Sequence, residues 1–266
     1  MALGTMSNGM VGIFRESIVF NMVLPCILLI IFTATLIRST FGFGEALVAV
    51  PLLALFIPVT VATPLATLLS VTIGGIVILQ DWRRIHLRSA SWLIGATIFG
   101  IPIGLLLLTS GHPISVKVVL ALTIIGFSLY SLLASRRIIL QQDDIRLLLV
   151  CGFAAGILGG AYGMNGPPLA IYGAMRQWTA QHFRATLQAY FLPASLIALA
   201  GYWWAGLWVP AVTHYYLVSL PVAVPAIFLG RFLNHRMERE GFVKYVYFGL
   251  VAVGLLLLAE AVHGKL

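Results

Sequence analysis

The stretch RSTFGFGE, residues 38–45, decides the fold of this chain, because it places charge and glycine between long apolar runs. Arg38 and Glu45 flank the stretch, whereas nearly every other ionisable side chain falls in a short polar break. A charge inside an apolar membrane segment is costly, so it is usually retained for a purpose. Glycine-rich interruptions that carry charge are typical of the discontinuous helices that hold ions and polar solutes within membranes.

The composition around this stretch is that of an integral membrane protein. Of the 266 residues, 61% are hydrophobic and 9% are charged, whereas a soluble domain carries about 25% charged residues. Backbone polar groups must be satisfied internally in lipid, and no alternating barrel strand is visible. The sequence therefore predicts an all-α, polytopic helical membrane protein. The net charge of +8 is spread over loops without interleaved aromatic residues, which argues against a nucleic-acid partner.

Long apolar stretches and two interrupted ones alternate along the chain. A helix needs about 20 apolar residues to cross a bilayer. The predicted full spans are Ser17–Ile37, Val61–Gln80, Ala90–Thr109, Val116–Ala134, Ala185–Ala205, Val209–Leu229 and Tyr245–Ala259. Phe41–Ile57 is short and glycine-rich, and Ile145–Tyr172 is interrupted by glycines and by the run NGPP at residues 165–168. Both are predicted to be broken or re-entrant segments.

The chain also contains a weak internal repeat. A shift of about 122 residues lays Gly44 on Gly166 and Leu47 on Leu169, with the same order of segments in each half. Arginine and lysine gather in alternate loops, which the positive-inside rule assigns to the cytoplasm, so the halves begin on opposite sides. We therefore expect an N-terminal segment (1–16) and two inverted-topology repeats (17–137 and 138–262) in one membrane domain, with the glycine-rich breaks at its centre.

Such breaks predict a site for a small anion. The N-terminus of a half-helix carries partial positive charge, and glycine lets a ligand approach its backbone. Arg38 could hold an oxyanion through its planar donor fork, or it could snorkel to an interface or only neutralise Glu45. Glu45 could take up a proton with the anion, or it could face an aqueous vestibule. Asn165 could donate to the anion or serve only a turn.

Further candidates for this anion site are glycines of the two breaks and two neighbouring polar side chains: Gly42, Gly44, Tyr162, Gly163, Gly166 and Gln188. None of the six histidines forms a metal-ligand pair at helical spacing, and no phosphate-binding loop of the ATPase type is present. We therefore expect no metal, no cofactor and no enzymatic activity.

Three motifs together resemble the TauE/SafE family of membrane proteins. They are GFGEALVAVPL at residues 42–52, GGAYGMNGPPL at 159–169 and FRAT at 183–186. The resemblance implies a secondary transporter that exports sulfite or small organosulfonates such as sulfoacetate by alternating access, with or without proton coupling. It also implies a multi-pass protein of a prokaryotic inner or plasma membrane, with the glycine motifs at the substrate site. Glu45 departs from the family pattern, in which a small or apolar residue is usual.

Two other functions stay open from the residues alone. An anion channel needs a continuous polar lining, which sequence does not distinguish from an occluded site. An intramembrane enzyme acting on lipid would need paired carboxylates, a metal set or an activated nucleophile at one depth, and Glu45 is the only carboxylate available there. A homodimer is compatible with the sequence as well.

Overall fold

The computed structural model describes residues 23–40, 42–81, 87–133, 140–141, 144–176, 180–234, 248, 250–259 and 261. All regular secondary structure within these residues is helical. Among them, six helices are long and apolar enough to cross a membrane: Val23–Thr40, Val59–Ile76, Ser91–Ser110, Pro113–Leu133, Ile145–Tyr162 and Pro210–Leu233. The prediction of a polytopic helical membrane protein is thereby confirmed.

The first described helix, Val23–Thr40, extends further than predicted. The expected span ended at Ile37, but the helix continues for three residues, and Arg38 therefore lies in its last turn. That boundary was wrong because a basic side chain is favoured, not excluded, by the partial negative charge at a helix C-terminus. The expected start of the span at Ser17 and the segment 1–16 lie outside the described residues.

The remaining long helices follow the predicted spans. They are α3 (Val59–Asp81), α4 (Leu87–Ser110), α5 (Pro113–Leu133), α8 (Ala180–Trp204) and α9 (Pro210–Asn234), followed by a helix at Leu250–Ala259. α8 is 25 residues long, which is enough to cross a bilayer.

Both predicted broken segments are present. Phe41–Ile57 contains the short helix α2 (Glu45–Leu53), and Ile145–Tyr172 divides into α6 (Ile145–Tyr162) and α7 (Gly166–Met175). Gly42 (φ 86°) and Gly163 (φ 67°) adopt left-handed backbone conformations after the helices that they end. Their N–H groups donate to the carbonyls of the residues four positions earlier, at 2.6 and 2.9 Å, as in glycine C-caps.

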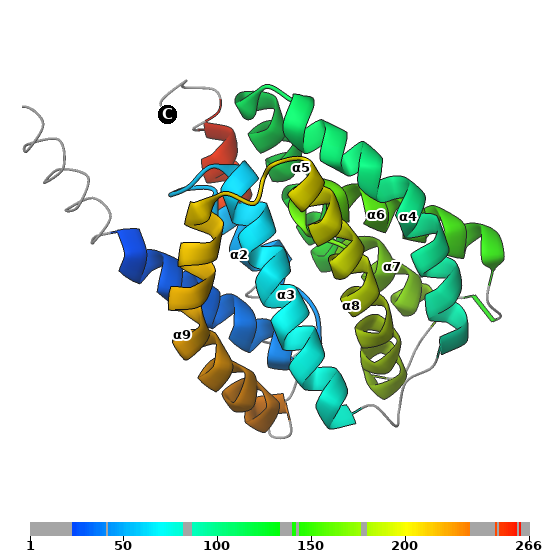
Figure 1. The fold of residues 1–266 in the computed structure, drawn as a ribbon. Helices are drawn as coiled ribbons and strands as arrows, with labels where there is room; N and C mark the ends of the chain where they lie inside the picture. Colours follow the sequence, from blue (N-terminus) through cyan, green and yellow to red (C-terminus); the bar gives the residue numbers. More distant parts are fainter. Residues whose placement is uncertain are drawn as a thin grey trace, which may run out of the picture.

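The helices form two lateral pairs around a central pair (Figure 1). α3 and α8 pack together at the centre. α4 and α6 lie on one side, and the first helix and α9 lie on the other, where Thr40 Oγ1 donates to Gly230 O at 3.3 Å. α2 packs against α3, and α7 packs against α6 and α8. This arrangement directs both broken segments toward the central helices.

The pair α4 and α6 is held by a glycine seam. Gly152, Gly156 and Gly160 recur every fourth residue along α6 and face the backbone of α4. A Cβ built on Gly152 would lie 2.7 Å from Leu93 O, and one on Gly156 would lie 2.5 Å from Thr97 O. Small residues at this spacing let membrane helices approach closely.

The described helices repeat in the same order along the chain. The first helix, α2, α3 and α4 correspond to α6, α7, α8 and α9, with bounds that differ by about 122 residues. The contacts between helices follow the same correspondence: α3 packs against α9, and its counterpart α8 packs against α4. The first helix contacts α9, as α6 contacts α4.

Candidate functional site

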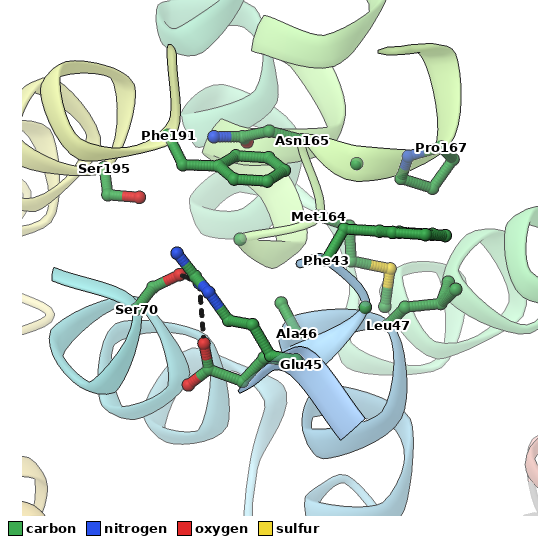
Figure 2. A pocket seen from close by; sticks show the side chains of 14 residues that line it. Phe43, Glu45, Ala46, Leu47, Ser70, Met164, Asn165, Pro167, Phe191 and Ser195 are labelled. Atoms are coloured by element: carbon green, nitrogen blue, oxygen red, sulfur yellow. Dashed lines mark hydrogen bonds and ion pairs between the residues drawn. The ribbon is translucent and has the colours of Figure 1, made fainter. Parts of the chain in front are cut away.

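The two breaks meet at one small cavity near the centre of the bundle (Figure 2). α2 and α7 contribute their N-terminal residues, and α3 and α8 close the sides. The cavity has a volume of about 20 Å³, which is close to the space that one water molecule needs. Its lining residues are Arg38, Phe43, Gly44, Glu45, Ala46, Leu47, Ser70, Gly163, Met164, Asn165, Gly166, Pro167, Phe191 and Ser195.

A buried ion pair forms one side of this cavity. Arg38 Nη1 donates to Glu45 Oε2 at 2.7 Å, and the two side chains are 4% and 1% exposed. The same nitrogen donates to Ser70 Oγ on α3. The guanidinium carbon of Arg38 lies 5.2 Å from the ring centroid of Phe191, within the range of a cation–π contact.

Helix ends explain how this pair is tolerated at membrane depth. Arg38 lies in the last turn of its helix, where partial negative charge favours a cation. Glu45 lies in the first turn of α2, where partial positive charge favours an anion. The break between the two helices is short, so it brings these oppositely charged side chains together.

The polar groups of the cavity are only partly satisfied. Nε and Nη2 of Arg38, Oε1 of Glu45 and Oδ1 of Asn165 are buried and lack a hydrogen-bond partner within the described part of the chain. Buried donors and acceptors are normally paired, and unpaired ones are costly. Two donor nitrogens of one arginine, left open beside a cavity, are suited to binding an oxyanion.

The two half-helices present their N-termini to the same space. Gly44 precedes α2 with a φ of 99°, and Gly166 is the first residue of α7. Pro167 and Pro168 follow in the first turn of α7, as predicted, where a missing N–H costs little. A Cβ on Gly166 would lie 3.6 Å from the ring of Phe43 and 3.9 Å from that of Phe191. Two aromatic rings therefore pack against the tip of α7.

Eight of the nine predicted site residues are fully described, and six of these line the cavity, namely Arg38, Gly44, Glu45, Gly163, Asn165 and Gly166. Asn165 and Phe191 lie on one side and Glu45 and Ser70 on the other (Figure 2).

Two predicted site residues within the described part of the structure, Gly42 and Tyr162, are not among the lining residues. Gly42 ends the first helix through its N–H bond to Arg38 O. The Tyr162 hydroxyl donates to Val116 O on α5 at 3.0 Å, so its side chain is directed into helix packing. Gln188 lies on α8, but its side chain is outside the described part of the structure.

Eight of the fourteen lining residues were not among the predicted site residues, namely Phe43, Ala46, Leu47, Ser70, Met164, Pro167, Phe191 and Ser195. Phe191 and Ser195 are one turn apart on α8, and Met164 lies within the second break. The spacing of Phe191 and Ser195 marks one helical face, but an apolar helix contains many such pairs. Only the packing of α8 against α3 shows which face is directed to the breaks.

Comparison with known proteins assigns the chain to a family. The model of a family described as Sulfite exporter TauE/SafE matches residues 27–257, which is nearly the whole chain. The chain belongs to this family, and the resemblance seen in its motifs is confirmed. It is a multi-pass membrane transport protein. No curated protein and no solved structure matches it.

Proposed function

We propose that this member of the TauE/SafE family is a secondary transporter that exports sulfite or small organosulfonates across a prokaryotic inner or plasma membrane. The observation that carries the proposal is the meeting of two broken helices at one cavity beside a buried arginine with unused donors. Broken helices with converging tips are a recurrent way of binding a solute near the bilayer midplane.

The chemistry of the lining suits an oxyanion. Arg38 supplies positive charge and donors, and the N-termini of α2 and α7 supply partial positive charge from two directions. Asn165 supplies an uncharged amide at the second break. Sulfite and sulfonate groups each present three oxygens, so several such donors can act at once.

Alternating access is the mechanism that we infer for these halves. The matching helix order and the exchanged contacts of α3 with α9 and of α8 with α4 support two inverted repeats, 17–137 and 138–262. In such transporters the two repeats move against each other around a fixed central site. The small size of the cavity favours an occluding carrier over an anion channel.

Glu45 is the residue that we propose for proton coupling. It binds Nη1 of Arg38, the guanidinium whose other two nitrogens an anion would approach. A proton on Glu45 would remove the repulsion between its carboxylate and an arriving anion. Anion binding and proton uptake would then favour each other.

The direct test is transport by the purified protein in phospholipid vesicles. We expect saturable uptake of labelled sulfite and of a small organosulfonate, with counterflow when unlabelled anion is preloaded. Ser70→Ala removes a hydroxyl from the Arg38 cluster and should slow uptake. Ser128→Ala removes a buried hydroxyl on α5 that does not line the cavity, and it should leave uptake unchanged.

Vesicles in which none of these anions moves would contradict the proposal, whereas flux that rises without saturation would favour a channel. Thermal unfolding in the presence of each anion gives an independent measure of binding, because a ligand of the folded state raises its stability.

A further inference from the structure

Arg38 uses only one of its two hydrogen-bonding edges. Its Nη1 donates to Glu45 Oε2 and to Ser70 Oγ, whereas Nε and Nη2 lack a partner among the residues that the structure describes. Nε and Nη2 lie side by side in the guanidinium plane, and such a pair matches two oxygens of one oxyanion. The unused edge is therefore a bidentate donor that is already in place.

Gly74 of α3 lies beside this edge. A Cβ at Gly74 would lie 3.7 Å from Arg38 Nη2 and 3.7 Å from Leu192 Cδ1, so the backbone of α3 passes close to the arginine here. Ser70, one turn earlier on the same helix, binds Nη1 and lines the cavity. An oxyanion bound to Nη2 would lie next to Gly74.

The charges around the cavity cancel before any anion binds. Of the lining residues, which all belong to the described part of the chain, Arg38 and Glu45 alone carry charge. Two groups near Glu45 come from neighbouring helices: Arg38 from the first helix and the uncharged Ser70 from α3. The α6–α7 break and α8 contribute only uncharged residues, such as Asn165 and Phe191. A net charge at membrane depth is costly, so the site should stay close to electrically neutral when a ligand is bound.

We propose that the cavity selects singly charged oxyanions, bound on the Nε and Nη2 edge of Arg38 together with one proton on Glu45. This inference rests on the proposed function and narrows its substrate class. A monoanion and a proton leave the buried site without net charge, whereas a dianion leaves one uncompensated charge even when Glu45 is protonated. Sulfite would thus be carried as hydrogensulfite, and a sulfonate with a second charge, such as sulfoacetate, would be disfavoured.

The test compares two sulfonates in vesicles that contain the purified full chain. Ethanesulfonate carries one charge, and ethane-1,2-disulfonate carries two, throughout the neutral pH range. We expect uptake of ethanesulfonate to be faster by at least about tenfold, which corresponds to about 1.4 kcal/mol. Its uptake should acidify the vesicle interior and should not respond to an imposed membrane potential.

Equal rates for the two sulfonates, or ethanesulfonate flux that follows the membrane potential, would overturn the inference and leave the proposed transport function standing. If neither sulfonate nor sulfite moves, the proposed function fails and the inference fails with it. The two failures are therefore distinguishable.

Glu45→Gln separates proton coupling from a structural role. The amide oxygen can still accept from Arg38, but the side chain no longer takes up a proton. Ethanesulfonate should then enter without acidifying the interior, and its flux should follow the membrane potential. Flux that remains coupled to protons in this variant would overturn the role of Glu45.

Gly74→Ala tests the proposed edge of Arg38, with Gly75→Ala as its matched control. The alanine Cβ at position 74 would make ordinary contact with Nη2, so the fold should persist, but the space for an oxyanion shrinks. Nothing lies within 4 Å of a Cβ at position 75. We expect ethanesulfonate binding, measured by thermal shift, to weaken by about tenfold only in Gly74→Ala. Equal affinity in the two variants would overturn the proposed edge.

Discussion

The two broken helices share a backbone device and differ in their chemistry. In both, a glycine with positive φ ends a long helix, Gly42 after the first helix and Gly163 after α6, and a short helix begins a few residues later. The first break carries the ion pair of Arg38 and Glu45. At the corresponding positions, about 122 residues later, the second break carries Gly160 and Pro167.

This difference shows that the two halves contribute different things to one site. The first half supplies charge, and the second half supplies an uncharged helix tip and Asn165. Gly160 cannot be replaced by a larger residue without displacing α4, because its Cα packs against the backbone of Ile101. The position that holds the arginine in one half is thus used for helix packing in the other.

The largest effect is expected when only one partner of the ion pair in the first break loses its charge. Arg38→Met leaves Glu45 buried without its partner, which should lower the free energy of unfolding by about 3–5 kcal/mol. Anion uptake should be lost as well. Thermal unfolding in detergent and vesicle uptake measure the two effects.

The double variant Arg38→Met/Glu45→Gln is the control for this loss, because it leaves no unpaired charge. It should regain most of the stability but none of the transport. Transport that survives in the single variant would remove Arg38 from the site.

In the second break, stability should depend on side-chain volume rather than on charge. At Gly160, even the methyl group of Gly160→Ala meets the backbone of Ile101, with the carbonyl carbon at 3.1 Å. Overpacking of this kind should cost about 1–3 kcal/mol of unfolding free energy. Gly95→Ala on α4, where nothing lies within 4 Å, is the control and should be neutral or slightly stabilising. Equal unfolding temperatures for the two variants would show that α4 and α6 are not closely packed at Gly160.

A smaller effect is expected at the glycine that turns the chain in the second break. Gly163→Ala places a Cβ at a φ of 67° and 2.8 Å from Thr67 Oγ1. The backbone strain alone should cost about 1–2 kcal/mol. Gly206→Ala has a similar φ, 71°, in open space, so it isolates the strain from the crowding. Gly163→Ala should unfold at the lower temperature of the two, and the reverse order would contradict the contact with Thr67.

The smallest effect on stability is expected at Asn165. Its Oδ1 is buried and has no hydrogen-bond partner among the described residues, so Asn165→Ala removes an unsatisfied acceptor and should change the free energy of unfolding by less than about 1 kcal/mol. Loss of an amide donor to a charged ligand should nevertheless weaken anion binding by about tenfold. Thermal shift with and without sulfite measures both quantities, and unchanged affinity would restrict Asn165 to the turn.

Much of the fold can be predicted from local sequence rules. The low charge content and the apolar runs of about 20 residues predict a helical membrane protein, because lipid leaves the backbone few alternatives. The glycines and the Pro167–Pro168 pair predict both breaks, because positive φ and the first helical turn place strict demands on residue type. The same rules end the first helix three residues too early, because the apolar run stops at Arg38, whereas a cation stabilises the last helical turn.

The composition of the site was less accessible. Arg38 and Glu45 could be singled out because charge is rare in this chain, and their separation across a short break allowed contact. Nothing in the pattern distinguished Phe191 and Ser195 from other residues of α8. Tyr162 was expected at the site from its place in the glycine motif, but its hydroxyl binds the backbone of α5 instead.

The sequence by itself thus determined the class of the protein, the positions of its helix breaks and the scarcity of its charges, since each depends on residue type or on neighbours within a few turns. Only the tertiary structure decided that both breaks share one cavity, that Ser70 joins the ion pair, and that one edge of Arg38 is left without a partner. These features depend on how α3 and α8 pack between the two breaks, and that packing is set by contacts between residues more than a hundred positions apart.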